Sequence, residues 1–175
     1  MTRPKLPRDD PYWDAFIHRA PADPNNVITH AFKQVKPGGV NPVKTEVHSP
    51  NVMSAHVKEL ARFYGADLVG IVALDTGFGI VCGVRTDYDS QSAVGIGGQT
   101  PAMKGLFATF TLGAYIRELG YTADASEADR ERLAAAAGLG TLDAGGRLVT
   151  RQFGRNVQVT DVMLTDLPLE PDGRA

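Results

Sequence analysis

The chain has 175 residues, with 18 basic and 20 acidic side chains and a formal net charge of −2 at pH 7. This balance lacks the excess of Lys and Arg that marks nucleic-acid-binding domains, so we expect no nucleic-acid partner. No apolar stretch reaches the ~18 residues that a membrane-spanning helix needs. No apolar run follows the charged amino terminus, as it does in a secretory signal. We therefore expect a globular, cytoplasmic protein with no membrane contact.

Cys82 is the only cysteine, and it lies in the apolar run FGIVCGV. One thiol forms no internal disulfide and cannot ligate an iron–sulfur cluster alone, so we predict a buried, small apolar side chain. The four histidines show none of the close pairing of a helical metal site, and no cysteine or carboxylate cluster joins them. The sequence therefore predicts no metal site.

Residues 1–50 are rich in Pro, Asn and Gly, which interrupt regular structure repeatedly. We predict an irregular arm that lies across a neighbouring surface, with a short helical turn anchored by Trp13, Phe16 and Ile17. Residues 51–175 would then form the folded domain. An arm of this kind suits the clasping of a second subunit, so a homodimer is one expectation.

Regular structure is predicted from about residue 50 onward, by helical spacing of apolar residues and by continuous apolar runs. The predicted helices and strands follow one another in the order helix, two strands, two helices and two strands: 51–64, 66–75, 78–88, 101–120, 126–138, 146–150 and 156–164. Asn51 or Ser54 would cap the first helix, and Ser126 would cap the third through a Ser-x-x-Asp box that places Glu127 and Asp129 in its first turn. The two long apolar strands suit a sheet covered on both faces. The order predicts an α/β fold.

Two features carry possible chemistry. Asp87 and Tyr88 follow the second strand, where strand ends of α/β folds often face a ligand crevice and where either group can exchange a proton. A polar turn that closes the strand explains them equally simply. The glycine-rich segment 92–101 precedes a helix, whose free N–H groups can receive an anion, although it lacks the lysine of a phosphate-binding loop. A structural turn and a ligand loop both remain open.

Four stretches together resemble one family. They are VKELARFYGADLVGIVALD, IVCGVRTDYD, LGAYIRELGYTADAS, and the run from AAAAGLG to TDLPLEPD. In order and spacing they are similar to the corrinoid-binding catalytic domain of the reductive dehalogenases and epoxyqueuosine reductases. The resemblance covers about residues 50 to 172. It implies a nitroreductase-like fold, with a mixed sheet flanked by helices, that holds cobalamin with its lower base displaced.

The resemblance also implies a set of residues beside the corrinoid. Small residues let the backbone approach a large flat ring, and such residues lie in the AGLG stretch. Tyr121 and the turn after it would lie near the upper side or the tail of the cofactor. The implied contact residues are Tyr121, Ala137, Gly138, Leu139, Gly140, Arg147, Phe153 and Gly154.

The sequence departs from this family in two respects. In the relatives TDLPLEPD leads into a cysteine-rich domain with two iron–sulfur clusters, whereas this chain ends at Ala175, so we expect no iron–sulfur cluster in it. The relatives' proton-donating tyrosine has no match near Thr100 and Pro101. Asp124 and Asp129 are the candidates for the acidic residue that epoxyqueuosine reductase uses.

The resemblance thus predicts a stand-alone corrinoid-binding protein, which is either a carrier or the binding half of a two-component reductase. Three alternatives remain open: a flavin enzyme that uses flavin mononucleotide (FMN) in the same fold, a reductase served by a separate ferredoxin, and a degenerate interaction domain.

Overall fold

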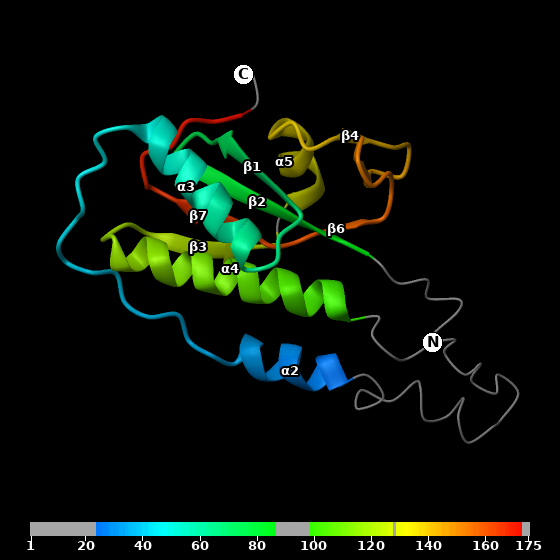
Figure 1. Cartoon of the computed structure of the whole chain (residues 1–175), viewed down its shortest axis with the longest axis horizontal. Coiled ribbons are helices and arrows are strands. Elements are labelled where there is room, and N and C mark those ends of the chain that lie inside the picture. Colours follow the sequence, from blue (N-terminus) through cyan, green and yellow to red (C-terminus); the bar gives the residue numbers. More distant parts are fainter. Residues whose placement is uncertain (1–23, 87–98, 128, 173–175) are drawn as a thin grey trace, which may run out of the picture.

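The computed structural model describes residues 24–86, 99–127 and 129–172. A five-stranded sheet forms the centre of the molecule, with helices on both of its faces (Figure 1). The helices are α2 (Pro24–Lys33), α3 (Pro50–Phe63), α4 (Thr100–Glu118) and α5 (Arg130–Ala136). The strands of the sheet are β1 (Leu68–Ala73), β2 (Phe78–Arg85), β3 (Ala123–Ser126), β6 (Val157–Val159) and β7 (Val162–Thr165). The predicted α/β class is confirmed.

The strand order is β1-β2-β7-β3, and β6 pairs with the carboxyl-terminal end of β2. Every pairing between the described strands is antiparallel. A separate two-stranded hairpin joins β4 (Thr141–Leu142) to β5 (Leu148–Val149). β2 is therefore the central strand, and six of its eight residues are buried, as its continuous apolar run predicted.

A β-bulge separates β6 from β7. Gly83 of β2 lies opposite Val159, and Ile80 lies opposite Met163. Two residues of β2 therefore face three residues of the partner, 160 to 162, and this one-residue excess defines a bulge. The single strand that we predicted over 156–164 is thus two short strands. The bulge matters for the site because it redirects the side chains of Thr160 and Asp161.

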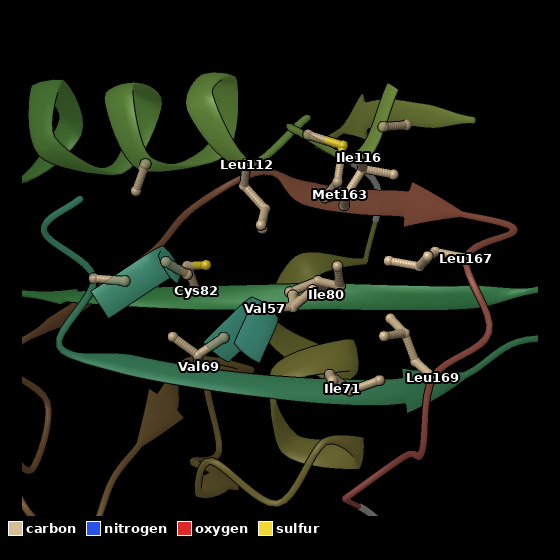
Figure 2. Close-up of a cluster of buried hydrophobic side chains, with 14 of the residues drawn as sticks. Val57, Val69, Ile71, Ile80, Cys82, Leu112, Ile116, Met163, Leu167 and Leu169 are labelled. Carbon is tan, nitrogen blue, oxygen red and sulfur yellow. The ribbon is translucent and has the colours of Figure 1, made fainter. Parts of the chain in front are cut away.

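Alternate residues of the strands fill two cores, as the two-residue period of a strand requires. On one face, Ile71, Ile80 and Met163 pack under α3 and α4 (Figure 2). On the other face, Val81 packs with α5 and the β4–β5 hairpin. Burial on both faces explains why the apolar runs of the two central strands are continuous rather than alternating. Cys82 lies in the first core with 1 % of its surface exposed, as predicted.

Several local predictions need correction. The first long helix is capped by Ser49, whose hydroxyl accepts from the Val52 N–H, and not by Asn51 or Ser54. Ser126 ends strand β3 instead of capping a helix. The third helix begins at Arg130, and its capping residue Asp129 has a left-handed backbone and no side-chain cap. Strand β3 itself was not predicted.

Helix α2 lies within the stretch for which the sequence predicted no regular structure. It packs on the side of α4 that faces away from the sheet (Figure 1). Phe32 meets Phe107 and Phe110 edge to face, with ring centroids 5.9 and 5.6 Å apart. Trp13, Phe16 and Ile17 lie outside the described residues. Within the described ranges, no helix is long and apolar enough to cross a membrane.

Candidate functional site

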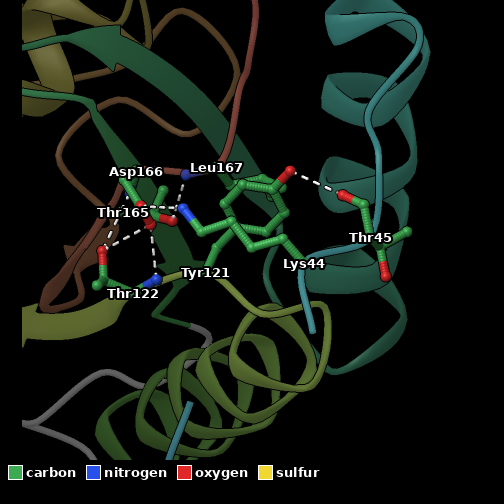
Figure 3. A network of polar contacts seen from close by, with 7 residues as sticks. All are labelled: Lys44, Thr45, Tyr121, Thr122, Thr165, Asp166 and Leu167. Carbon is green, nitrogen blue, oxygen red and sulfur yellow. Dashed lines mark hydrogen bonds and ion pairs between the residues drawn. The ribbon is translucent and has the colours of Figure 1, made fainter. Parts of the chain in front are cut away.

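The TDLPLEPD segment serves the fold itself. Asp166 accepts hydrogen bonds from the N–H and the hydroxyl of Thr122, at 2.6 and 2.8 Å, and from Lys44 at 2.9 Å (Figure 3). These contacts tie β7 to the start of β3 and to the segment before α3. Burial alone would raise the pKa of Asp166, but the hydrogen bonds from Lys44 and Thr122 outweigh it and hold that pKa below its usual 3.8. Leu167 and Leu169 close the first core behind it.

The end of the same segment closes the open edge of the sheet. The Asp172 carboxylate accepts from the Ile71 N–H of β1 at 2.8 Å, and its own N–H donates to the Ile71 carbonyl at 2.9 Å. Asp172 also pairs with Lys58 of α3. The Ser54 hydroxyl accepts from the Glu170 N–H at 2.7 Å. The segment therefore joins α3 to an edge strand whose backbone groups need partners.

The AGLG stretch forms the carboxyl-terminal cap of α5. The Gly138 N–H donates to Ala135 and the Leu139 N–H donates to Ala134, which is the pair of bonds of a Schellman motif. Gly138 has a φ of +76°, the left-handed conformation that this motif requires. Ala137 packs on β1, where a Cβ added to Gly70 would lie only 2.8 Å from the Ala137 Cβ. The small residues therefore bring α5 close to the sheet.

Three more of the residues that the resemblance implied, Arg147, Phe153 and Gly154, lie in the β4–β5 hairpin and the turn after it. The Arg147 N–H donates to the Asp143 carboxylate at 3.0 Å, and the Arg147 carbonyl accepts from the Asp143 N–H at 2.9 Å. The Asp143 carboxylate also forms an ion pair with Arg155 at 2.9 Å. The backbone hydrogen bond from Arg147, aided by the nearby arginine charges, lowers the pKa of Asp143. The Arg85 guanidinium lies over the ring of Phe153, and its carbon is 5.8 Å from the ring centroid. Gly154 turns the chain with a φ of +56°.

The structure gathers these residues only in part. Seven of them lie together in the "α5 lobe", which we define as residues 130–156, from the start of α5 through the β4–β5 hairpin to the turn after it: Ala137, Gly138, Leu139, Gly140, Arg147, Phe153 and Gly154. Tyr121 lies on the opposite face of the sheet, where its hydroxyl donates to the Thr45 carbonyl at 2.8 Å and Lys44 covers its ring (Figure 3). Tyr121 therefore lies apart from the α5 lobe.

A pocket of about 150 Å³, which sequence reasoning missed, lies at the bulge. Its floor includes one face of α4, and its rim comes from α2, the start of α5 and the bulge itself. We call it the "bulge pocket". It is lined by Thr29, Lys33, Gln99, Ala102, Leu106, Thr109, Glu127, Arg130, Gln158, Val159, Thr160 and Asp161. Gly105 lets α4 lie close to the bulge, because a Cβ at this position would be only 2.4 Å from the methyl group of Thr160.

Charged groups face one another across the bulge pocket. Asp161 is half-buried, and its carboxylate lies 3.7 Å from the guanidinium of Arg130. Burial raises the pKa of Asp161, and the negative charge of Glu127 raises it further, whereas Arg130 and Lys33 lower it by less. The signal that pointed here was a single acidic residue inside the apolar run VQVTDVML, which the strand interpretation passed over.

The other sequence candidates lie elsewhere. Asp87 and Tyr88 fall outside the described residues, as do positions 92–98 of the glycine-rich segment. The described end of that segment, Gln99, lines the bulge pocket. Asp124 is exposed on β3, away from the pocket lining. Among the residues described, no group of three or more His, Cys, Asp or Glu side chains is placed to hold a metal ion.

Comparison with known proteins adds a fold relationship. No family model and no curated protein matches the sequence. Solved structures do match. A reductive dehalogenase whose structure suggests a mechanism for B12-dependent dehalogenation shares 23 % identity, with a TM-score of 0.69 over 85 % of this chain and 24 % of its own. The tagged catabolic reductive dehalogenase NpRdhA shares 21 %, with a TM-score of 0.73 over 99 % of this chain and 27 % of its own.

A single-residue variant of NpRdhA matches as well, at 24 % identity and a TM-score of 0.66 over 83 % of this chain and 24 % of its own. The chain has a reductive dehalogenase-like fold. It spans about a quarter of the length of the structures that it matches. At these identities the likeness establishes the fold.

Proposed function

We propose that the chain is a corrinoid-binding domain that serves as the binding half of a reductase. The observation that carries the proposal is the match of 83–99 % of the chain to structures of reductive dehalogenases, one of them described as B12-dependent. The AGLG and TDLPLEPD stretches, on which the sequence resemblance rests, lie within that fold. A corrinoid, when bound, supplies a redox-active cobalt ion; the chain supplies the surface that holds and orients the ring.

The α5 lobe fits a large flat ring at two places. A Cβ added to Gly138 or Gly154 would meet nothing within 4 Å, so the backbone is open to close approach there. Arg147 is exposed beside them on the same lobe, and Phe153 is half-buried. Gly138, Arg147, Phe153 and Gly154 are therefore the residues proposed to contact the cofactor.

The rest of the implied contact set is packed against other parts of the fold. Ala137 and Leu139 face β1, where the two side chains lie within 3.0 Å of a Cβ added to Gly70. Gly140 packs on the β5 backbone, since a Cβ there would lie 2.3 Å from the Val149 carbonyl oxygen. These residues hold the lobe in place. Tyr121, on the other face, braces the segment before α3.

Electrons would come from a donor outside residues 1–175, for which a ferredoxin-type protein or domain is the natural class. An iron–sulfur cluster usually needs four thiolate ligands. This chain has one cysteine, and burial raises the pKa of the Cys82 thiol to about 12. Cys82 therefore stays a protonated core residue at neutral pH.

Calorimetric titration of the purified chain with hydroxocobalamin, and in parallel with FMN, tests the proposal. We expect saturable binding of the corrinoid, loss of the absorbance features of a coordinated lower base, and no binding of FMN. Arg147→Ala should weaken corrinoid binding by about fivefold, as loss of one charged contact does. The matched control Arg62→Ala, at an exposed position of α3 on the opposite face of the sheet, should leave it unchanged. Binding of FMN alone would replace the proposal with a flavin enzyme.

A further inference from the structure

The α5 lobe concentrates positive charge. Residues 130–156 contain five arginines, no lysine and two acidic residues, so the lobe carries a formal charge of +3. Since the whole chain carries −2, the remainder of the chain carries −5. The lobe lies on the face of the sheet opposite to α3 and α4 (Figure 1). The chain is therefore polarised, with its positive part at the proposed cofactor surface.

Both acidic side chains of the lobe are bound by its own backbone. Glu131 accepts a hydrogen bond from the Leu148 N–H at 2.8 Å. Asp143 accepts from the N–H groups of Gly145 and Arg147 at 2.9 and 3.0 Å, and only 15 % of its side chain is exposed. These hydrogen bonds hold the two negative charges against the backbone instead of the solvent.

The arginines lie at the surface instead. Four of the five are exposed: Arg132, Arg147, Arg151 and Arg155. Arg155 pairs with Asp143, yet 71 % of its side chain is exposed. Among the residues that the structure describes, the other three form no ion pair. The fifth arginine, Arg130, pairs with Asp161 at the bulge. The outer surface of the lobe therefore presents four cations to the solvent.

Direct contacts join these cations to the proposed cofactor surface. The Asp143 carboxylate that pairs with Arg155 at 2.9 Å also accepts from the Arg147 N–H at 3.0 Å. Arg151 lies within the turn 150–154, whose two end residues are paired with each other. Arg147 and this turn both belong to the surface proposed to hold the corrinoid. A partner that binds the exposed arginines therefore lies beside the cofactor.

The composition of this surface favours a protein partner. Leu142 of the β4–β5 hairpin is 39 % exposed, and Phe153 is half-buried. Protein interfaces are enriched in arginine and aromatic residues and depleted in lysine. Nucleic-acid binding draws its affinity from many contacts between cationic side chains and phosphates. The charge of −5 on the rest of the chain would repel so long a polyanion, whereas a compact acidic protein can contact the lobe alone.

We propose that the outer surface of the α5 lobe is the docking site of an acidic electron-transfer protein, bound through Arg132, Arg151 and Arg155. The inference rests on the proposed function and deepens it by naming the surface at which the electron donor docks. A donor has to approach the group that it reduces, and the exposed arginines lie beside that group. Encounters between electron-transfer proteins bury little area, so complementary charge supplies their orientation and their rate of association.

Two acidic probes test the docking site: a plant-type [2Fe–2S] ferredoxin and a flavodoxin. Each is titrated into the full ¹⁵N-labelled chain, and a basic cytochrome c serves as the control of opposite charge. We expect micromolar binding of the acidic probes at low salt, with amide shifts centred on Arg132, Arg151 and Arg155. Affinity should fall by about tenfold or more between roughly 20 and 300 mM NaCl, because salt screens exposed charges. Cytochrome c should not bind.

Charge reversal separates this surface from net charge. The double variant Arg132→Glu with Arg151→Glu should weaken binding of the acidic probes by at least about tenfold. Arg132→Lys with Arg151→Lys keeps the charge and should retain most of the affinity. The control Lys36→Glu, at an exposed position after α2, changes the net charge as much as one of these reversals does and should weaken binding by less than about twofold. Far-ultraviolet circular dichroism confirms that each variant is folded.

The proposal is overturned if neither acidic probe binds at low salt, or if the double reversal binds them as well as the natural chain does. Tighter binding of a short DNA duplex than of either acidic probe would also overturn it, in favour of a nucleic-acid surface. Titration with hydroxocobalamin is a separate measurement. Corrinoid binding without binding of the acidic probes refutes only this inference, and binding of the probes without corrinoid binding refutes only the proposed function.

Discussion

Replacing Asp166 with alanine tests whether the TDLPLEPD segment acts as a strap, that is, whether its side-chain contacts stabilise the fold by holding β7 to β3 and to the segment before α3. The Asp166 carboxylate accepts three hydrogen bonds from two residues, one of them the charged Lys44. Hydrogen bonds to a charged group contribute about 1.5–3 kcal/mol each when buried. The side chain of Asp166 is 44 % exposed, so solvent screening reduces each contribution to roughly 0.5–1 kcal/mol. We expect Asp166→Ala to lower the free energy of unfolding by about 2 kcal/mol.

Urea denaturation followed by far-ultraviolet circular dichroism measures this difference, with Asp124→Ala as the control for loss of an exposed aspartate near the same strands. The pKa of Asp166 is lowered in the folded state, so its stabilising effect is present above the pKa of the unfolded chain and is lost as the pH falls through the folded value. The difference between the natural chain and Asp166→Ala should therefore shrink below about pH 4. Equal stability of the Asp166 and Asp124 variants at pH 7 would refute the strap interpretation.

Two substitutions test the packing and the cap of the α5 lobe, and one labelling experiment tests the first core on the other face of the sheet. Gly70→Ala should destabilise the fold by about 1–3 kcal/mol in urea, because the new Cβ lies 2.8 Å from the Ala137 Cβ and displaces α5. Gly138→Ala should cost about 1 kcal/mol through its φ of +76° alone, since nothing lies within 4 Å of the added Cβ; a larger cost would show a contact that the structure does not contain. Cys82 should resist iodoacetamide at pH 8 until urea unfolds the chain, because burial holds its pKa near 12; rapid labelling of the folded chain would contradict its burial.

The long elements of the fold are predictable from the sequence because each satisfies a strong local pattern. β1 and β2 are continuous apolar runs that the sheet buries on both faces. Helix α4 begins with Pro101 in its first turn and ends before Gly120, which has the positive φ of a helix stop. In these elements local preference and tertiary burial agree.

The elements that escaped prediction depend on contacts between distant residues. β3 has the sequence ADAS, in which only Ala123 is buried, and it is a strand because β7 lies beside it. Helix α2 begins in a Pro-Asn-Asn stretch that favours turns, and it is held by aromatic contacts with α4. The β-bulge at Thr160 is visible only in the register of β2 against two strands.

The candidate sites divide in the same way. The AGLG stretch is local, and its role as a helix cap follows from the left-handed Gly138. The bulge pocket draws Lys33, Arg130 and Asp161 from three elements separated by up to 128 positions in the sequence. No spacing rule connects such residues. Small residues in the family-like stretch suggested contact with a cofactor, and the packing role of Ala137 and Gly140 that the structure shows could not be predicted from their size alone.

The central claim is that a corrinoid binds on the outer surface of the α5 lobe. Amide chemical-shift mapping of the ¹⁵N-labelled chain during titration with hydroxocobalamin tests it most directly. The account predicts that the largest shifts fall at Gly138, Arg147 and Gly154, while Tyr121 and Thr122 on the opposite face stay unchanged. Absence of any shift, or shifts centred on Tyr121, would contradict the account.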